Sequence, residues 1–174
     1  MPVDLKSKIR DIPDFPKRGI VFKDIMPLLA DPEALHETVE QLAEFAEPRR
    51  PDYILGAEAR GFILGAALAY RLNCGFVAAR KPGKLPWRTI SAKYALEYGF
   101  DALELHADAI TDGARVLIHD DLLATGGTAK AKIDLVEQLG GTVVGLAFVI
   151  ELEFLSGREK LEGYDVCSLI KYSE

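Results

Sequence analysis

Two adjacent carboxylates, Asp120 and Asp121, follow an apolar run that begins at Val116 and is typical of a buried strand. A loop of small and hydroxyl residues comes soon after them and leads into a predicted helix: Ala124, Thr125, Gly126, Gly127 and Thr128. The two glycines let backbone N–H groups approach an anion, the helix N-terminus adds oriented N–H groups, and the two threonines add hydroxyl donors. The spacing therefore predicts a binding site for one phosphate.

The two acids would repel a phosphate if they touched it, so they fit better beside it, where they can accept hydrogen bonds from sugar hydroxyls. A phosphate loop next to paired carboxylates predicts a ribose 5-phosphate site. The alternative is an ordinary strand–turn–helix with solvated acids, which is less favoured because carboxylates at the end of a buried strand are otherwise costly. The loop is not a Walker A loop, because no Gly-Lys-Ser/Thr follows at the required spacing.

A second glycine-containing turn, residues 56–61, joins a predicted strand to a predicted helix and again presents N–H groups to an anion, here beside the guanidinium of Arg60. Farther along, residues 80–93 hold five basic residues and no acid: Arg80, Lys81, Lys84, Arg88 and Lys93. Such a local positive patch suits a polyanion. An ordinary turn and a solvated charged loop remain as alternatives for these two segments.

The composition excludes several classes of protein. The chain has 174 residues, which favours one domain over residues 1–174, and its formal net charge of −6 argues against a protein that coats nucleic acid. No apolar run approaches the ~20 residues of a membrane span, and the N-terminus lacks a signal-peptide pattern. Cys74 and Cys167 are far apart in apolar segments, so we expect reduced thiols in a cytoplasmic protein and no structural zinc site.

Short β-rich runs alternate with helical stretches, and this pattern predicts an α/β fold with a central, mainly parallel sheet flanked by helices. Strands are predicted over 53–57 and 76–79, from 116 onward, and over 143–150 and 166–170; helices over 3–10, 32–46, 60–72 and 127–139. Residues 11–30 are predicted to be irregular. Residues 82–99 lack apolar periodicity, so we expect a long loop there, and loops of that length are often functional lids.

The segment over residues 120–128, Asp-Asp-Leu-Leu-Ala-Thr-Gly-Gly-Thr, closely resembles the 5-phosphoribosyl 1-pyrophosphate (PRPP) motif of the type I phosphoribosyltransferases. The resemblance runs from about residue 12 to residue 172. It implies that Asp120 and Asp121 bind the ribose hydroxyls, that residues 124–128 bind the 5-phosphate, and that four residues bind the pyrophosphate: Ala59, Arg60, Arg80 and Lys84. It also implies a cis peptide between Glu58 and Ala59. The family usually has Asp-Ser there, so only the backbone of Ala59 can serve.

Two further segments resemble the adenine-using members of that family. Residues 15–25, Phe-Pro-Lys-Arg-Gly-Ile-Val-Phe-Lys-Asp-Ile, imply a small hood, about residues 11–30, in which Phe22 stacks on the base and backbone groups near Val21 and Lys23 read its polar edge. By composition alone, Phe22 would more often be a core residue. Residues 94–99 imply that Glu97 is the catalytic carboxylate that reaches the reacting base and that Tyr98 shields the site within a flexible loop, about 82–99.

The resemblance implies the reaction of adenine with PRPP to give AMP and pyrophosphate, by a homodimer, with Mg²⁺ bound mainly through the substrate diphosphate and no nucleic-acid or membrane partner. The same chemistry on another base, such as xanthine, hypoxanthine or orotate, is an alternative. A non-catalytic regulator that senses PRPP and binds nucleic acid is another, but it would need an added domain or a basic surface. The His119 side chain should point opposite to that of Asp120, toward packing or solvent.

Overall fold

The computed structural model describes residues 2–96 and 98–174. Within them the strands are β1 (Arg10–Ile12), β2 (Phe22–Asp24), β3 (Tyr53–Ala57), β4 (Gly75–Ala79), β5 (Thr89–Ala95), β6 (Phe100–His106), β7 (Arg115–Leu123), β8 (Thr142–Leu152) and β9 (Val166–Tyr172). The α-helices are α1 (Met26–Ala30), α2 (Pro32–Ala46), α3 (Arg60–Leu72) and α4 (Gly127–Gln138). Short 3-10 helices occur at η1 (Leu5–Lys8), η2 (Glu47–Arg49), η3 (Glu153–Leu155) and η4 (Gly157–Leu161).

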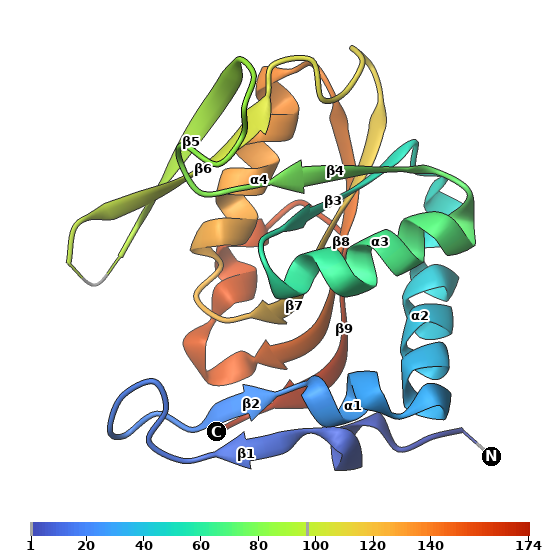
Figure 1. The fold of residues 1–174 in the computed structure, drawn as a ribbon, viewed down its shortest axis with the longest axis vertical. Coiled ribbons are helices and arrows are strands. Elements are labelled where there is room, and N and C mark those ends of the chain that lie inside the picture. The colour runs from blue at the N-terminus through green and yellow to red at the C-terminus, as the bar shows by residue number, and fades with distance from the viewer. Residues whose placement is uncertain (1, 97) are drawn as a thin grey trace.

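The central element is a five-stranded sheet in the order β4-β3-β7-β8-β9, and every neighbouring pair in it is parallel (Figure 1). The predicted α/β class is confirmed. The predicted helices that flank the sheet are present too: Asp31 caps α2 by accepting hydrogen bonds from two backbone N–H groups, and Pro32 occupies its first position. The order of strands brings the carboxyl ends of β3 and β7 together, which is where parallel sheets bind ligands.

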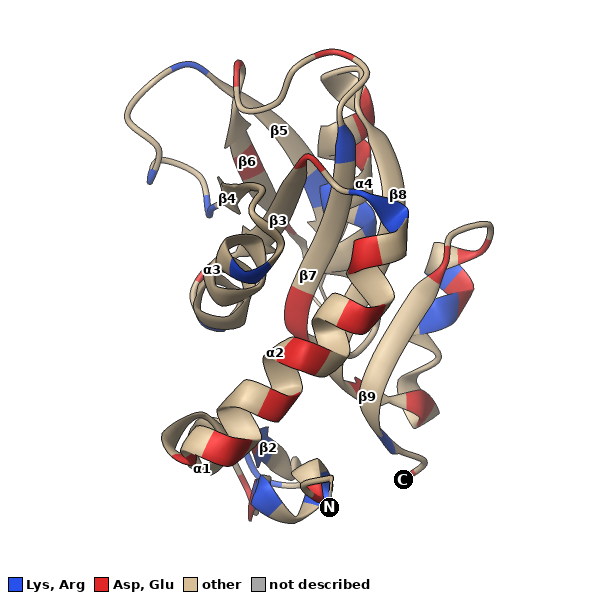
Figure 2. Cartoon of the chain, turned by 90° about the vertical axis from the view of Figure 1, so that its right-hand side faces the viewer, with Lys and Arg blue, Asp and Glu red and all other residues tan. Residues whose placement is uncertain are grey.

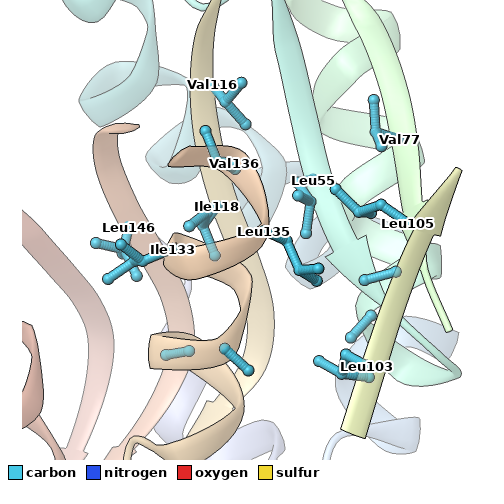
Figure 3. Close-up of a cluster of buried hydrophobic side chains, with 14 of the residues drawn as sticks. Leu55, Val77, Leu103, Leu105, Val116, Ile118, Ile133, Leu135, Val136 and Leu146 are labelled. Carbon is cyan, nitrogen blue, oxygen red and sulfur yellow. The ribbon is translucent and has the colours of Figure 1, made fainter. Parts of the chain in front are cut away.

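Both faces of the sheet are buried, and successive side chains of β7 point alternately into the two hydrophobic cores on either side of it. Val116 and Ile118 point to the face covered by α4, where they meet apolar residues of α4 and of β6 (Figure 3). Leu117 points to the other face and packs with residues of α2 and α3. A strand that is covered on both sides reads as a continuous apolar run, which is why the sequence around Val116 was recognisable as a strand.

The prediction of an irregular loop over residues 82–99 is wrong for residues 89–95. They form β5, which pairs antiparallel with β6. The pattern that marks this strand is short: Ile90, Ala92 and Tyr94 are buried or half-buried, while the residues between them are exposed. Ala92 joins the core beside α4. Such a period of two over small and hydroxyl residues was too weak a signal without its partner strand.

The N-terminal segment also differs from expectation. The helix predicted over residues 3–10 is only the short 3-10 helix η1, because Asp4 caps a single turn and the chain then enters β1. Residues 11–30, predicted as irregular, contain β2 and α1. β1 and β2 form a small antiparallel pair that lies apart from the central sheet (Figure 1). Two strands of three residues carry too few side chains for a visible alternation.

Candidate active site

A cleft of about 350 Å³ lies at the carboxyl end of the sheet, where β3 leads into α3 and β7 leads into α4. Nine of the residues predicted for the site line it: Ala59, Arg60, Asp120, Asp121, Ala124, Thr125, Gly126, Gly127 and Thr128. The structure therefore brings the phosphate loop, the paired acids and the start of α3 into one cavity. The strand continues past the acids, since β7 pairs with β8 as far as Leu123.

Each of the two acids forms a salt bridge with a basic side chain from a different helix. The Arg60 Nε atom, at the start of α3, lies 2.5 Å from Asp121 Oδ2, and the Lys132 Nζ atom, in α4, lies 2.8 Å from Asp120 Oδ2. Successive residues of a strand point to opposite faces, so each acid meets the helix on its own side of the sheet. Arg60 was predicted as a pyrophosphate ligand, and in this structure its guanidinium is held by Asp121.

The two carboxyls differ in acidity. Burial raises the pKa of Asp121 to about 6, and the neighbouring charge of Asp120 adds to this effect although Arg60 opposes it. Burial would also raise the pKa of Asp120, but the charge of Lys132 and the hydrogen bonds with Asp121 and Lys132 together hold that pKa below its ordinary value. At neutral pH both carboxyls are ionised, and Asp121 is the one that gains a proton first as the pH falls.

The phosphate loop is fixed by a close backbone contact. Gly126 has φ +88°, and a Cβ atom there would lie 2.6 Å from the carbonyl oxygen of Gly157. Glycine is required for both reasons, because other residues rarely adopt this φ and a side chain has no space. Lys160 donates a hydrogen bond to the Thr125 carbonyl at 2.9 Å. Among the described residues no side chain caps the start of α4, which begins at Gly127, and the residues of its first turn line the cleft.

The turn after β3 carries the predicted cis peptide: the bond between Glu58 and Ala59 is cis, so this prediction is confirmed. The Glu58 carboxylate accepts hydrogen bonds from the backbone N–H of Lys81 at 2.8 Å and from Arg80 Nε at 3.2 Å. The backbone bond and the Arg80 charge lower the pKa of Glu58 although burial opposes them. Arg80 is thereby tied to the turn that lines the cleft, while Lys84 is exposed and does not line it.

Charge is distributed unevenly over the molecule. Acidic segments follow one another along α2, and basic residues lie along the connection between β4 and β5 (Figure 2). Two basic residues of the predicted patch have acidic partners, because Arg80 pairs with Glu58 and Lys81 pairs with Asp101. The ring of Trp87 lies 4.6 Å from the Arg88 guanidinium carbon. The patch is therefore less positive than its sequence indicates.

The hairpin of β5 and β6 covers one side of the cleft. Tyr94, Ala95 and Leu96 line the cavity, and Lys81 donates a hydrogen bond to the Tyr94 hydroxyl at 2.7 Å. Glu97, the predicted catalytic residue, lies outside the described residues. Tyr98 is 87% exposed and does not line the cleft.

A second cavity, of about 640 Å³, lies beside the hood. It is lined by Val21 and Lys23 and by apolar side chains at and just after the end of β8, including Leu152, Phe154 and Leu155. Phe22 is absent from this lining; its ring lies 5.2 Å from the Arg60 guanidinium carbon. The ring of Phe22 is thus near Arg60, which lines the first cleft, and its chain neighbours Val21 and Lys23 line the second. The amine of Lys23 is directed to Asp11, at 2.8 Å, and to the ring of Tyr172.

Three residues of the site were missed in the sequence: Glu58 as a ligand of Arg80, Tyr94 in the cleft lining, and Lys132 beneath Asp120. Lys132 had a usable signal. It falls among buried positions of α4, between Ala131 and Ile133, where a lysine is rare unless it has a partner. His119 is buried and its Nδ1 atom lies 2.9 Å from the Ala147 carbonyl oxygen, so of the two environments that the sequence left open for this residue, packing or solvent, the structure shows packing.

Within residues 2–96 and 98–174, no group of three or more His, Cys, Asp or Glu side chains could hold a metal ion. In the same part of the chain no helix has the length and apolar character needed to cross a membrane.

Phosphoribosyltransferases typically have a parallel sheet that brings three features into one cleft: a glycine-containing loop at a helix N-terminus, two adjacent acids, and a second turn between a strand and a helix. Consistent with this, the phosphoribosyl transferase domain family matches residues 31–171. A relative from Thermotoga maritima, named adenine phosphoribosyltransferase, is 58% identical over 170 residues that cover 98% of each chain.

Solved structures agree with this result. The crystal structure of adenine phosphoribosyltransferase from Thermoanaerobacter pseudethanolicus has a TM-score of 0.95 and 58% identity, with 97% of this chain and 98% of that chain covered. The Saccharomyces cerevisiae enzyme, solved with adenine and an imino-altritol bisphosphate, has a TM-score of 0.91 and 41% identity, with 95% and 96% covered. The chain therefore belongs to the adenine phosphoribosyltransferase family, and it is a pentosyltransferase.

Proposed function

We propose that this protein joins adenine to the ribose of PRPP, releasing pyrophosphate and forming AMP in purine salvage. The observation that carries the proposal is the single cleft that holds Asp120 and Asp121 beside the phosphate loop at the start of α4. Two carboxylates accept hydrogen bonds from ribose hydroxyls, and the N–H groups of the loop bind the 5-phosphate through residues 124–128. The relatives at 58% identity carry the corresponding name.

The pyrophosphate of PRPP binds at the turn before α3. The backbone at Ala59 supplies N–H groups, and Arg60 supplies a guanidinium that must leave Asp121 to reach the diphosphate. Arg80 is already held at this turn by Glu58, and Lys84 adds a further positive charge as the connection between β4 and β5 closes. These groups position an anion that is the leaving group of the reaction.

The base binds where the two cavities approach each other. Phe22 offers an aromatic face for stacking, and the Arg60 guanidinium carbon lies 5.2 Å from the centre of its ring. Backbone groups at Val21 and Lys23 read the polar edge of adenine. The Lys23 amine is engaged with Asp11, so recognition by its backbone tolerates lysine in place of the more common arginine.

The bond between ribose C1 and the pyrophosphate oxygen loosens first, and its electron pair leaves with pyrophosphate. N9 of adenine attacks C1 from the opposite face, which inverts that carbon, and the imidazole proton of adenine passes to a basic group at the site or to solvent. Asp120 and Asp121 are both paired with basic side chains, and residues 2–96 and 98–174 contain no group of three or more His, Cys, Asp or Glu side chains that could hold a metal. Mg²⁺ would be held mainly by the diphosphate oxygens of the substrate and would neutralise charge on the leaving group. Chelation should abolish activity and leave the melting temperature of the ligand-free protein unchanged.

The loop that carries Glu97 and Tyr98 excludes water from the activated sugar, because water would otherwise hydrolyse PRPP. Glu97 is the catalytic carboxylate that reaches the reacting base. Glu97→Leu should lower kcat strongly with only a modest change in the KM of either substrate. A Glu97→Leu enzyme with the turnover of the wild type would remove this assignment.

The active form is a cytoplasmic homodimer of single-domain subunits, with Arg80 or Lys84 reaching toward the partner's cleft. Cys74 and Cys167 are free, half-buried thiols, as suits a reducing compartment. Sedimentation at micromolar concentration tests the dimer: a species of twice the chain mass is expected, and a monomer with full activity contradicts it.

The decisive assay is a competition among bases with labelled PRPP. Adenine, hypoxanthine, xanthine and orotate are supplied together, and the labelled nucleotides are separated. AMP should be the dominant product and pyrophosphate its equimolar partner. A dominant product from another base would keep the chemistry and overturn the choice of adenine; PRPP binding without any nucleotide product would indicate a sensor.

A further inference from the structure

A lysine is fully buried beneath the acids of the cleft. Lys132 lies on the face of α4 that packs on the sheet, and none of its surface is exposed. Its Nζ atom lies 2.8 Å from Asp120 Oδ2, while Asp120 Oδ1 accepts the backbone N–H of Asp121 at 2.9 Å. Both oxygens of the Asp120 carboxylate are thus engaged, so its position is fixed before any substrate arrives.

Packing alone does not explain this lysine. Its neighbours on the buried face of α4 are apolar, and a methionine or leucine would fill the same space without taking a charge out of water. An ammonium at this position is tolerated because Asp120 compensates it. In return, it supplies a positive charge directly behind a carboxylate that faces the cleft.

The second acid has a counter-ion of a different kind. The side chain of Arg60 is 41% exposed and lines the cleft, so it can leave Asp121 when a stronger anion enters. Lys132 is enclosed and cannot reach a ligand. One acid of the pair has a permanent counter-ion and the other has one that can be exchanged.

We propose that Lys132 is a positioning residue that keeps Asp120 ionised and oriented to accept the ribose hydroxyls of PRPP, while Arg60 moves from Asp121 to the pyrophosphate. The inference rests on the proposed function of the cleft. Two basic side chains thus perform two tasks that one mobile side chain could not perform together: keeping the acids that bind ribose charged, and binding the leaving group.

The other titratable groups near Asp120 support this assignment. In the turn between β3 and α3, the carboxylate of Glu58 is bonded to Arg80. On α3, Gly61 lies close to Asp120, since a Cβ atom there would be 2.8 Å from Oδ1. On β8 the paired residue is apolar, Phe148. Within residues 2–96 and 98–174, the remaining charged or titratable groups that act on this acid pair are on β7 and at the start of α3: His119, Asp121 and Arg60. Burial keeps His119 neutral, so Lys132 is the enclosed cation beside Asp120.

Lys132→Met tests the proposal, and Lys130→Met is its matched control. Lys130 lies on the exposed side of the same helix and pairs with Asp134. The steady-state KM of each substrate is measured over pH 5 to 9 for the wild type and both variants. For Lys132→Met we expect the KM of PRPP to rise about tenfold or more, as for loss of a charged partner, with the KM of adenine unchanged. We also expect the acidic limb of kcat/KM for PRPP to move up by about one pH unit or more.

If Lys132→Met does not fold, Lys132→Gln provides the same test, because its amide keeps a polar group at the position without the charge. A lower melting temperature with an unchanged KM for PRPP and an unchanged pH profile would overturn the proposal, since that result describes a packing residue. A wild-type protein that forms no AMP would instead contradict the proposed function. Lys130→Met should match the wild type, and an equal change there would also overturn the proposal.

Discussion

His119 should make the fold sensitive to acid. The residue precedes Asp120 on β7, its side chain is fully buried, and its Nδ1 atom lies 2.9 Å from the Ala147 carbonyl oxygen. No hydrogen-bond partner of Nε2 is found among residues 2–96 and 98–174. Burial lowers the pKa of His119 from 6.5 to about 4, although the charge of Asp120 opposes the change. The folded protein therefore holds this imidazole neutral.

The sign and size of the effect follow from proton linkage. Between about pH 6.5 and pH 4 the unfolded chain carries a proton on His119 and the folded chain does not. Protonation therefore favours unfolding, and the free energy of unfolding decreases as the pH is lowered. With these two pKa values, the loss is less than about 0.1 kcal/mol at pH 7.5 and about 2.5 kcal/mol at pH 4.5.

Urea unfolding followed by far-UV circular dichroism measures this loss. The comparison is His119→Asn, whose amide can still donate to the Ala147 carbonyl but does not titrate. Its smaller side chain lowers the free energy of unfolding by an amount that does not depend on pH. The advantage of the wild type over the variant should therefore shrink by about 2.5 kcal/mol between pH 7.5 and pH 4.5, at equal protein concentration.

A parallel loss of stability in both proteins would refute the reasoning, because it would assign the acid sensitivity to groups that they share. The histidine can also be followed directly by NMR in the folded protein. A side-chain resonance of His119 that titrates near its ordinary pKa would equally contradict the buried, neutral state.

Two further predictions concern the cleft. Gly126→Ala should raise the KM of PRPP about tenfold or more. The φ of +88° strains an alanine by about 1–2 kcal/mol, and the added Cβ would displace the carbonyl of Gly157. Gly163→Ala is the control that carries backbone strain alone, because Gly163 has φ +92° and open space around it. Since Asp121 must be ionised to accept hydrogen bonds from ribose hydroxyls, kcat/KM for PRPP should fall below about pH 6. Asp121→Asn should have a lower kcat/KM at neutral pH and should not show this acidic decline. A decline that persists in the variant belongs to the phosphates of PRPP.

Local patterns predicted the central elements well. An apolar run predicted the limits of β3, and an amphipathic stretch predicted those of α3. Asp31 followed by Pro32 predicted the start of α2. Glycines and threonines after a buried strand predicted the phosphate loop, because the geometry of a strand, turn and helix is set by residues that are neighbours in the chain. β1, β2, β5 and β6 were missed. β1 and β2 have only three residues each, and β5 and β6 depend on packing against α4, which lies elsewhere in the sequence.

The sequence by itself predicted a parallel α/β sheet and placed two adjacent acids before a glycine-containing loop over residues 120–128, and its family resemblance predicted the cis peptide before α3. Only the tertiary structure decided which base serves which acid. Arg60 meets Asp121 across 61 positions because β3 lies next to β7 in the sheet, and Lys132 meets Asp120 because α4 folds back over the strand that precedes it. Local propensity carries no information on such pairings; they arise when the apolar faces of helices and strands are buried together.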